Sequence, residues 1–294
     1  MRVLIAGASG LIGSALGTRL RESGHDVRTL VRRPTDRPGE FSWNPPSGRL
    51  DAAALDGVDA VVNLCGSPMV SGRWSAARKQ MIADSRLEPT VVLAEAVAEH
   101  GIGVLVNASG IGFYGDTGDT TVDETHPAGD GFLASLCVDW EGATAPASDA
   151  GARVVSLRTG LVLSGRGGLL GALKPLFWLA LGGRLGDGTQ YMPWISLTDE
   201  VSAIMYALDN DTVSGPVNLC GPAPATNAEF TKAMGRALHR PAPWWVPAAA
   251  LKVALGEAAD QMALISQRAV PRKLETSGFA FTHPDLDSAL AAAL

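Results

Sequence analysis

The chain has 294 residues, of which 46% are hydrophobic and 18% charged, and these proportions exclude a disordered or fibrous protein. The 24 Lys and Arg residues against 30 Asp and Glu give a net charge of −6. Because the chain is mildly acidic and has no basic run, a nucleic acid is not expected as a partner. Three cysteines without a Cys-x-x-Cys pair fit a reducing compartment and exclude a disulfide scaffold and a cysteine-based zinc site, so no metal is expected.

Neither a cleaved leader nor a membrane span is predicted. The first residues lack a charged start followed by a long apolar stretch. The most apolar later windows, 175–183 and 244–255, are shorter than the roughly 20 residues needed to cross a bilayer. We therefore expect a soluble, cytoplasmic protein, a monomer or homodimer, that binds a small molecule and has no membrane partner.

Strand-like and helical segments alternate along the first half of the chain. Residues 2–6, 12–20 and 26–31 predict a strand, a helix and a second strand, the size of a βαβ unit. Further strands are predicted at 60–64, 104–108 and 154–157, and helices at 75–100, interrupted at Pro89, and at 132–150. Strands that are apolar on both faces and alternate with helices indicate an α/β fold with a doubly wound parallel sheet.

A composition change near Gly165 predicts two parts. Residues 1–165 form the expected nucleotide-binding domain, and 190–222, with a strand and helix at 194–208 and a strand at 217–219, are expected to return to it. Residues 166–189 and 223–294 form a smaller C-terminal substrate lobe. The junction of the two parts is the expected binding site.

The most specific motif lies between the first strand and the first helix. Residues 7–13 have the sequence Gly-Ala-Ser-Gly-Leu-Ile-Gly. Gly7 allows a tight turn, Gly10 lets the backbone approach a pyrophosphate, and Gly13 lets the helix pack close to the strand. In this context a dinucleotide-binding turn is favoured over a structural turn. The expected contacts come from Gly7, Ser9, Gly10, Leu11, Ile12 and Gly13.

The end of the second strand predicts which dinucleotide binds. NAD-selective folds usually place a carboxylate there to hold the ribose hydroxyls, whereas this chain has Arg32 and Arg33. Two guanidinium groups suit a 2′-phosphate, so NADP(H) is expected. The alternative is a solvated pair of surface arginines.

These segments resemble the extended short-chain dehydrogenase/reductases of the NAD(P)-dependent epimerase/dehydratase superfamily, and in particular its atypical "epimerase family" branch. The segments that carry the resemblance are 7–13, 59–66, 108–115, 132–141, 158–163, 186–199, 227–230 and 256–279. The resemblance implies a Rossmann-type fold and NADP(H) binding. It also implies cofactor contacts from Leu64 and Cys65, from Arg86 on the following helix, from Ser109, and from Leu161 near the nicotinamide.

The sequence departs from this family at the residues that carry the reaction. The family uses a Tyr, a Lys four residues later and a Ser, but no Tyr-x-x-x-Lys occurs here. Alignment on Glu141 places Leu133 at the Tyr position and Cys137 at the Lys position, and Gly110 holds the Ser position. Where nucleotide-sugar enzymes commonly have an Arg, this chain has Met192, which disfavours a nucleotide-sugar substrate.

Three polar side chains are candidates for a substitute proton donor. Tyr114, in a glycine-rich loop after a strand, is the first, assisted by Ser109, and a wall of the nicotinamide pocket is its alternative role. Glu141 is the second, with a structural hydrogen bond as the alternative. Tryptophans at 178, 194, 244 and 245 line either an apolar substrate pocket or the core.

Two functions therefore stay open at the level of the sequence. One is an oxidoreductase or redox-coupled isomerase that acts on a small carbonyl or hydroxyl compound. The other is a catalytically silent protein that holds NADP(H) as a redox or nucleotide sensor or a scaffold. The missing Tyr and Lys favour the second, and the intact cofactor loops favour the first.

Overall fold

A mixed sheet of eight strands forms the centre of the molecule in the computed structural model, which describes residues 1–69 and 72–294. In spatial order the strands are β13 (Gly215–Leu219), β8 (Arg153–Thr159), β6 (Val104–Gly110), β5 (Ala60–Asn63), β1 (Arg2–Ala6), β2 (Asp26–Val31), β3 (Glu40–Asn44) and β4 (Arg49–Leu50). All neighbours are parallel except β3 and β4. The predicted doubly wound parallel sheet is confirmed, with one short antiparallel strand added at its edge.

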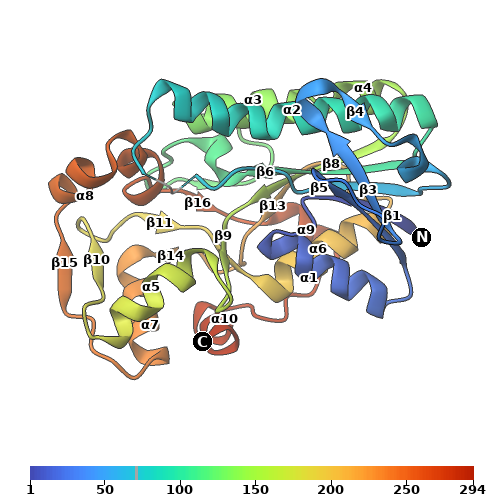
Figure 1. Cartoon of the computed structure of the whole chain (residues 1–294). Coiled ribbons are helices and arrows are strands. Elements are labelled where there is room, and N and C mark those ends of the chain that lie inside the picture. Colours follow the sequence, from blue (N-terminus) through green and yellow to red (C-terminus); the bar gives the residue numbers. More distant parts are fainter. Residues whose placement is uncertain (70–71) are drawn as a thin grey trace.

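Helices cover both faces of this sheet and give three layers (Figure 1). One face carries α1 (Leu11–Glu22), α6 (Leu197–Asp209) and α9 (Arg272–Ser277), and the other carries α2 (Ala76–His100), α3 (Phe132–Gly142) and α4 (Ala145–Asp149). Side chains of β1 alternate between the two cores, since Val3 and Ile5 pack with α1 and α6, whereas Leu4 and Ala6 pack with α2. Burial on both faces explains the continuous apolar runs in the sequence.

Helix α2 continues through Pro89, so the predicted interruption there is wrong. Proline removes one backbone donor from a helix and usually bends or ends it. Here both halves are anchored, because Ile82 before the proline and Leu93 and Val97 after it are fully buried. Tertiary packing of a 25-residue helix on the sheet thus overrides the local cost.

Most of the remaining elements lie at one end of the sheet and along its edge (Figure 1). They are the helices α5 (Gly168–Trp178), α7 (Asn227–Ala237), α8 (Ala248–Leu255) and α10 (Leu286–Ala293), the 3-10 turn η3 (Ile111–Tyr114), and the strands β7 (Thr121–Val122), β9 (Leu161–Leu163), β10 (Gly183–Leu185), β11 (Tyr191–Met192), β12 (Trp194–Ser196), β14 (Ala225–Thr226), β15 (Trp244–Val246) and β16 (Arg268–Ala269). The small strands form two-stranded pairs: β9 with β12, β10 with β15, β11 with β14, and β7 with β16.

The chain after residue 165 is shared between these outer elements and the main sheet. As expected, β13 joins the sheet beside β8, and α6 packs on the same face as α1. The C-terminal segment also returns, because Leu274 on α9 is fully buried in the core under α1 and α6. The two-part division itself stays a prediction. In the described part of the chain no helix combines the length and the apolar character that crossing a membrane requires.

Glu200 is a buried carboxyl group at the start of α6. Its side chain is fully enclosed, Oε1 accepts a hydrogen bond from Thr159 Oγ1 at 2.9 Å, and Oε2 has no partner. Burial raises the pKa of Glu200 to about 8, and the Thr159 hydrogen bond only partly opposes this. The group is therefore protonated in the folded protein at neutral pH.

This proton makes the free energy of unfolding pH-dependent. Between the ordinary pKa of 4.5 and the raised value of about 8, the folded state binds more protons than the unfolded chain. Stability from this group therefore falls as the pH rises through that window, by up to about 1.4 kcal/mol per pH unit. Glu200→Gln should be close to wild type at pH 5 and more stable than wild type at pH 9, measured by urea unfolding.

An exposed carboxylate supplies the control for this experiment. Glu95→Gln lies on the exposed face of α2 and should not alter the pH profile. If Glu200→Gln and wild type keep the same difference in stability from pH 5 to pH 9, the buried carboxyl does not carry the proton.

Candidate functional site

The glycine turn between β1 and α1 is held by close backbone contacts. Gly7 has φ +83°, a conformation that side chains rarely adopt, and a Cβ there would lie 2.6 Å from the carbonyl oxygen of Leu64. A Cβ on Gly13 would overlap the carbonyl of Gly7. Both positions therefore require glycine for packing, as the sequence pattern predicted, and they bring the start of α1 against the ends of β1 and β5.

Gly10 differs from these two because its Cα faces open space. A Cβ there would meet only the Gly7 carbonyl, at 3.4 Å. The first helical hydrogen bond of α1 runs from the Ser14 amide to the Gly10 carbonyl, at 2.9 Å, so the amides of Leu11, Ile12 and Gly13 precede it. No side chain caps this end and no acidic residue lies in its first turn. The turn is thus ready to hold an anionic group such as a pyrophosphate.

The two arginines after β2 differ in their partners. Arg33 is held by Glu40, with Nη2 donating to Oε2 at 2.6 Å. Arg32 is exposed, and no carboxylate of the described residues pairs with it. Burial raises the pKa of the Cys65 thiol to about 12, and the charge of Arg32 opposes this shift. Arg32 is therefore the arginine that is free to meet a phosphate.

The segment after β5 is fixed by buried amide side chains. Asn63 Nδ2 donates to Thr90 on α2 at 2.9 Å and to Asn107 on β6 at 2.7 Å, while its Oδ1 accepts from the Cys65 amide at 3.1 Å. These contacts set where Leu64 and Cys65 lie, beside Gly7. Three predicted cofactor residues thus lie together at the carboxyl ends of two neighbouring strands.

Arg86 lies under the same segment as a buried cation. Its guanidinium donates from Nη2 to the Ser67 carbonyl at 3.1 Å and from Nη1 to the Ile82 carbonyl at 3.0 Å, and it lies over the ring of Trp140. Burial lowers the pKa of Arg86 to about 10, which leaves it charged at neutral pH. Its buried Nε has no partner. The described contacts give Arg86 a role in holding the chain after Cys65.

Leu161 lies at the start of β9, beyond the end of β8. Its amide donates to the Pro193 carbonyl at 2.6 Å, and it is partly buried. The first residue of α5, Gly168, reaches the start of α1, since a Cβ on it would lie 3.6 Å from Leu11. Leu161 therefore lies on a stretch of chain that leads to the start of α1, where the glycine turn is.

A buried ion pair forms the centre of a polar network between β6, β8 and α3. Arg158 Nε and Nη2 donate to the two carboxylate oxygens of Glu141, each at 2.9 Å, and Ser109 Oγ donates to Oε1 at 2.7 Å. Arg158 Nη1 donates to the Tyr114 hydroxyl at 3.0 Å, and that hydroxyl donates to Asn218 Oδ1 at 2.7 Å. All three predicted catalytic residues belong to this one network.

The placement of these residues changes how their predicted roles are interpreted. Tyr114 is 4% exposed, its proton points at Asn218, and burial raises its pKa to about 12. Both carboxylate oxygens of Glu141 are engaged by Arg158. These contacts give Glu141 the structural hydrogen bonds that were its alternative role, and they give Tyr114 a structural role that the sequence did not suggest; the catalytic roles stay predictions.

The three positions aligned with the family's reactive residues lie around the end of β6 and the turn η3. Cys137 Sγ donates to the Gly110 carbonyl at 3.6 Å, and Leu133 lies against Gly112, where a Cβ would be 3.2 Å away. Burial raises the pKa of the Cys137 thiol to about 11, so it remains protonated. This wall carries no charged group.

Two members of the network, Arg158 and Asn218, were missed as site residues. Arg158 is 4% exposed and Asn218 is fully buried. Both residues lie in otherwise apolar strands, 153–159 and 215–219, and this pattern could have identified them as members of a buried network. Charged and polar side chains are seldom buried without a partner. The sequence alone does not show that these partners are Glu141 and Tyr114.

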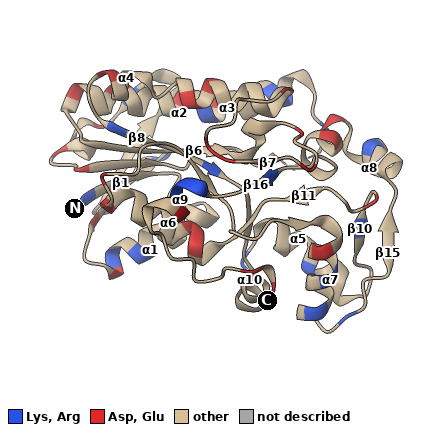
Figure 2. Cartoon of the chain, turned by 180° about the vertical axis from the view of Figure 1, so that it is seen from behind, with Lys and Arg blue, Asp and Glu red and all other residues tan. Residues whose placement is uncertain are grey.

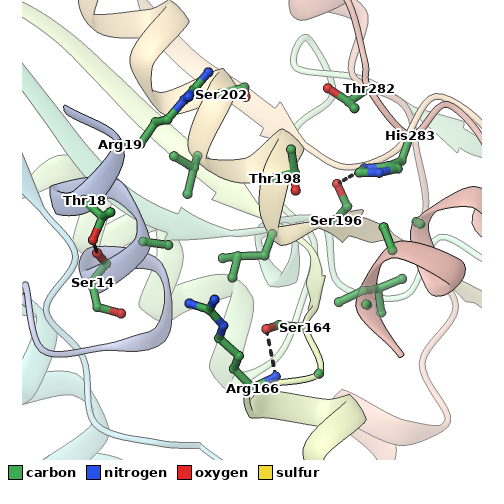
Figure 3. Close-up of a pocket in the computed structure, with 18 of the residues that line it drawn as sticks. Ser14, Thr18, Arg19, Ser164, Arg166, Ser196, Thr198, Ser202, Thr282 and His283 are labelled. Atoms are coloured by element: carbon green, nitrogen blue, oxygen red, sulfur yellow. Dashed lines mark hydrogen bonds between the residues drawn. The ribbon is translucent and has the colours of Figure 1, made fainter. Parts of the chain in front are cut away.

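A cavity of about 860 Å³ lies away from these residues, between α1, α6, the loop after β9 and the C-terminal segment (Figure 3). None of the predicted cofactor residues lines it. Ser196 donates to the buried Asp199 at 2.8 Å, and the amides of Thr282 and His283 donate to the same carboxylate at 2.7 and 3.0 Å. These bonds fix the C-terminal segment to α6, and we assign the cavity no part in the site.

A family model described as "NAD dependent epimerase/dehydratase family" matches residues 3–220, and a domain of unknown function, DUF1731, matches 246–293. The chain belongs to the NAD dependent epimerase/dehydratase family. An epimerase family protein of Mycobacterium bovis, Mb2239, is 56% identical over 98% of this chain and 96% of its own length.

Two solved structures are similar over the whole chain. The human epimerase family protein SDR39U1 (isoform2) with NADPH has a TM-score of 0.91 and 34% identity, and covers 100% of this chain and 99% of the human one. A nucleoside-diphosphate sugar epimerase from Corynebacterium glutamicum has a TM-score of 0.83 and 39% identity, with 100% of this chain and 58% of that one covered. The predicted family and the predicted fold are thus confirmed.

Gly10→Val tests where the cofactor binds. The folded chain has room for the side chain, because φ at Gly10 is −73° and the nearest atom is 3.4 Å away. The branched side chain would fill the space expected for the pyrophosphate, so NADPH binding should weaken by more than about 100-fold while the melting temperature changes little. Isothermal titration calorimetry and thermal unfolding measure the two effects.

Gly103→Val is the matched control, since Gly103 is exposed and nothing lies within 4 Å of its Cβ position. It should bind NADPH as wild type does. Normal NADPH affinity in a folded Gly10→Val protein would contradict this location for the cofactor.

Proposed function

We propose that this chain is an NADP(H)-binding member of the epimerase/dehydratase family that acts as an oxidoreductase or redox-coupled isomerase on a small carbonyl or hydroxyl compound. The observation that carries the proposal is the open, uncapped turn at Gly10, which the close contacts of Gly7 and Gly13 hold at the ends of β1 and β5. An anion-ready helix start at this edge of a parallel sheet is how the fold binds dinucleotides.

NADP(H) is proposed over NAD(H) because of Arg32. Its guanidinium has no carboxylate partner among the described residues, whereas Arg33 is committed to Glu40. No acidic residue stands at the end of β2 to hold ribose hydroxyls. The human relative whose structure is described with NADPH, at 34% identity over the full chain, supports the same choice.

When bound, the reduced cofactor supplies a hydride. We propose that Leu133, Cys137 and Leu161 lie beside the nicotinamide, where they give apolar contacts and move no proton. The proton that balances hydride addition to a carbonyl then comes from water or from the substrate itself, because Tyr114 and Glu141 are engaged in the buried network. General acid catalysis typically contributes about 10²–10⁴ to a rate, so turnover without it is expected to be slow.

A nucleotide-sugar substrate is not proposed. Met192 lies where related enzymes commonly have an arginine, and its sulfur accepts a hydrogen bond from Asn227 Nδ2 at 3.1 Å. Its partly buried side chain packs in the core near Phe230. A thioether in that place gives no charge to neutralise a diphosphate.

A second candidate function is a protein that holds NADP(H) without turnover, as a sensor or scaffold. The observation that favours it is the uncharged wall formed by Gly110, Leu133 and Cys137. One experiment distinguishes the two functions. The protein with stoichiometric NADPH is incubated with a broad set of aldehydes, ketones and sugars, and the oxidation of NADPH is followed at its absorbance maximum. Oxidation with stoichiometric product supports the enzyme, and its absence across the set supports the sensor.

Arg32→Gln tests the cofactor choice. Loss of a charged contact to the 2′-phosphate should weaken NADPH binding about tenfold to a hundredfold and leave NADH binding unchanged. Calorimetric titration with both cofactors measures the effect. Arg37→Gln, which removes a highly exposed arginine from the same loop, is the control and should leave both affinities unchanged. Equal losses for both cofactors in Arg32→Gln would show that the arginine does not contact the phosphate.

Tyr114→Phe tests whether the phenol hydroxyl is an acid or a structural group. Because the hydroxyl bridges Asn218 and Arg158 inside the core, we expect the free energy of unfolding to fall by about 1–3 kcal/mol. NADPH affinity and any kcat should stay within about threefold of wild type. Urea unfolding and steady-state kinetics measure these quantities. A tenfold or greater loss of kcat with unchanged NADPH affinity would restore Tyr114 as the proton donor.

A further inference from the structure

Large apolar side chains are exposed together at one end of the molecule. Of the tryptophans that the sequence placed in a pocket or in the core, only Trp194 is buried, at 1% exposure, while Trp178 is 60% exposed and Trp244 and Trp245 are 57% exposed. Most of the exposed large hydrophobic residues among those described belong to two segments: Leu176, Trp178, Leu179, Leu181, Trp244, Trp245 and Val253. We call these seven side chains the apolar end.

The two segments of the apolar end are joined into one surface. Strands β10 and β15 pair, with Arg184 opposite Trp245, and Trp244 Nε1 donates to the Ala180 carbonyl at 2.7 Å. Helix α8 follows β15 and has no buried residue. Figure 1 places β10, β15 and α8 at the end of the molecule opposite the N-terminus. Consecutive strand residues face opposite sides, so equal exposure of both tryptophans means that the β10–β15 ribbon protrudes.

Basic residues outnumber acidic ones within the two segments of the apolar end, while Asp187, Glu229 and Glu257 lie directly beyond them and Asp287 and Asp260 pair with Arg236 and Lys252. Residues 174–186 and 230–256 contain six of the chain's 24 Lys and Arg residues and none of its 30 Asp and Glu residues, in a protein whose net charge is −6. Figure 2 shows Lys and Arg on α7 and α8 and along β10 at this end, with Asp and Glu among them. Arg184, Lys232 and Arg240 have no carboxylate within ion-pair distance among the described residues.

The guanidinium of Arg240 also links the basic and apolar parts of this surface. Its Nε donates to the Trp178 carbonyl at 3.2 Å, and its carbon lies 5.8 Å from the centre of the Trp178 ring. Protein segments that lie in the interface of an anionic bilayer combine tryptophans and leucines with basic side chains that have no acidic partner. The aromatic rings enter the headgroup region, and the cations contact lipid phosphates.

We propose that the apolar end docks on the surface of a membrane that contains anionic lipid. The β10–β15 ribbon and the exposed face of α8 enter the interface, and Arg184, Lys232 and Arg240 contact the headgroups. A second copy of the chain is the alternative occupant, and the experiment below distinguishes the two. The expectation of no membrane partner rested on the lack of a spanning stretch, and surface binding needs none. The proposal is independent of turnover.

Vesicle co-sedimentation of the full chain with bound NADPH tests this proposal. Wild type should bind vesicles of phosphatidylcholine mixed with phosphatidylserine, and binding should weaken as salt rises. It should bind vesicles of phosphatidylcholine alone at least about tenfold less. The double variant Arg184→Gln/Lys232→Gln should lower the partition coefficient on the anionic vesicles by about 30-fold, from about 1 kcal/mol for each cation. Leu179→Ser/Trp245→Ser should lower it by at least about tenfold.

The matched control removes exposed apolar side chains elsewhere. Met81→Ser/Val138→Ser changes two residues that are 46% and 45% exposed on α2 and α3, and it should bind vesicles as wild type does. Each variant is first shown to melt near the wild-type temperature and to bind NADPH. Equal binding to both vesicle types, no binding to either, or no effect of the apolar-end variants would overturn the proposal. Sedimentation equilibrium that shows a dimer which the same variants dissociate would assign the surface to a second copy instead.

Discussion

The contact between Gly7 and the backbone of Leu64 is the constraint on which the candidate site depends. Parallel strands β1 and β5 end side by side, with Ala6 opposite Asn63, and the chain leaves both at the same edge of the sheet. Because Gly7 has no side chain, the turn into α1 lies directly against the segment after β5. Any Cβ there would separate the two ends and move the helix start away from Cys65. The cofactor region is therefore defined by backbone packing before any polar side chain contributes.

The buried Glu141–Arg158 pair is the second organising feature, and it connects elements that are distant in sequence. Through Ser109, Tyr114 and Asn218 it ties β6, η3 and β13 to α3 and β8. A buried ion pair adds little net stability, since desolvation offsets most of the attraction, but it fixes geometry strongly because neither partner tolerates loss of the other. In this chain the pair and its partners bury the polar groups that lie nearest to the positions where the family has its reactive Tyr, Lys and Ser.

The proposed cofactor site and the proposed membrane surface are built from different kinds of structural element. The site lies at the carboxyl ends of β1 and β5 and is built on rigid strands and a buried amide network. The apolar end is built on a protruding two-stranded ribbon and a helix with no buried residue.

The sequence by itself determined the βαβ start, the glycine turn and the parallel sheet, because these follow from local patterns: apolar runs of strand length, helical spacing, and glycines where the backbone approaches itself. Tertiary structure decided the rest. Helix α2 continues through Pro89 because its two halves are anchored by packing. Tyr114 is enclosed because Arg158 and Asn218, 44 and 104 residues away, reach its hydroxyl. The exposure of Trp178, Trp244 and Trp245 is likewise set by what the fold leaves uncovered. Burial and hydrogen-bond partners are properties of contacts between distant segments, which no local pattern specifies.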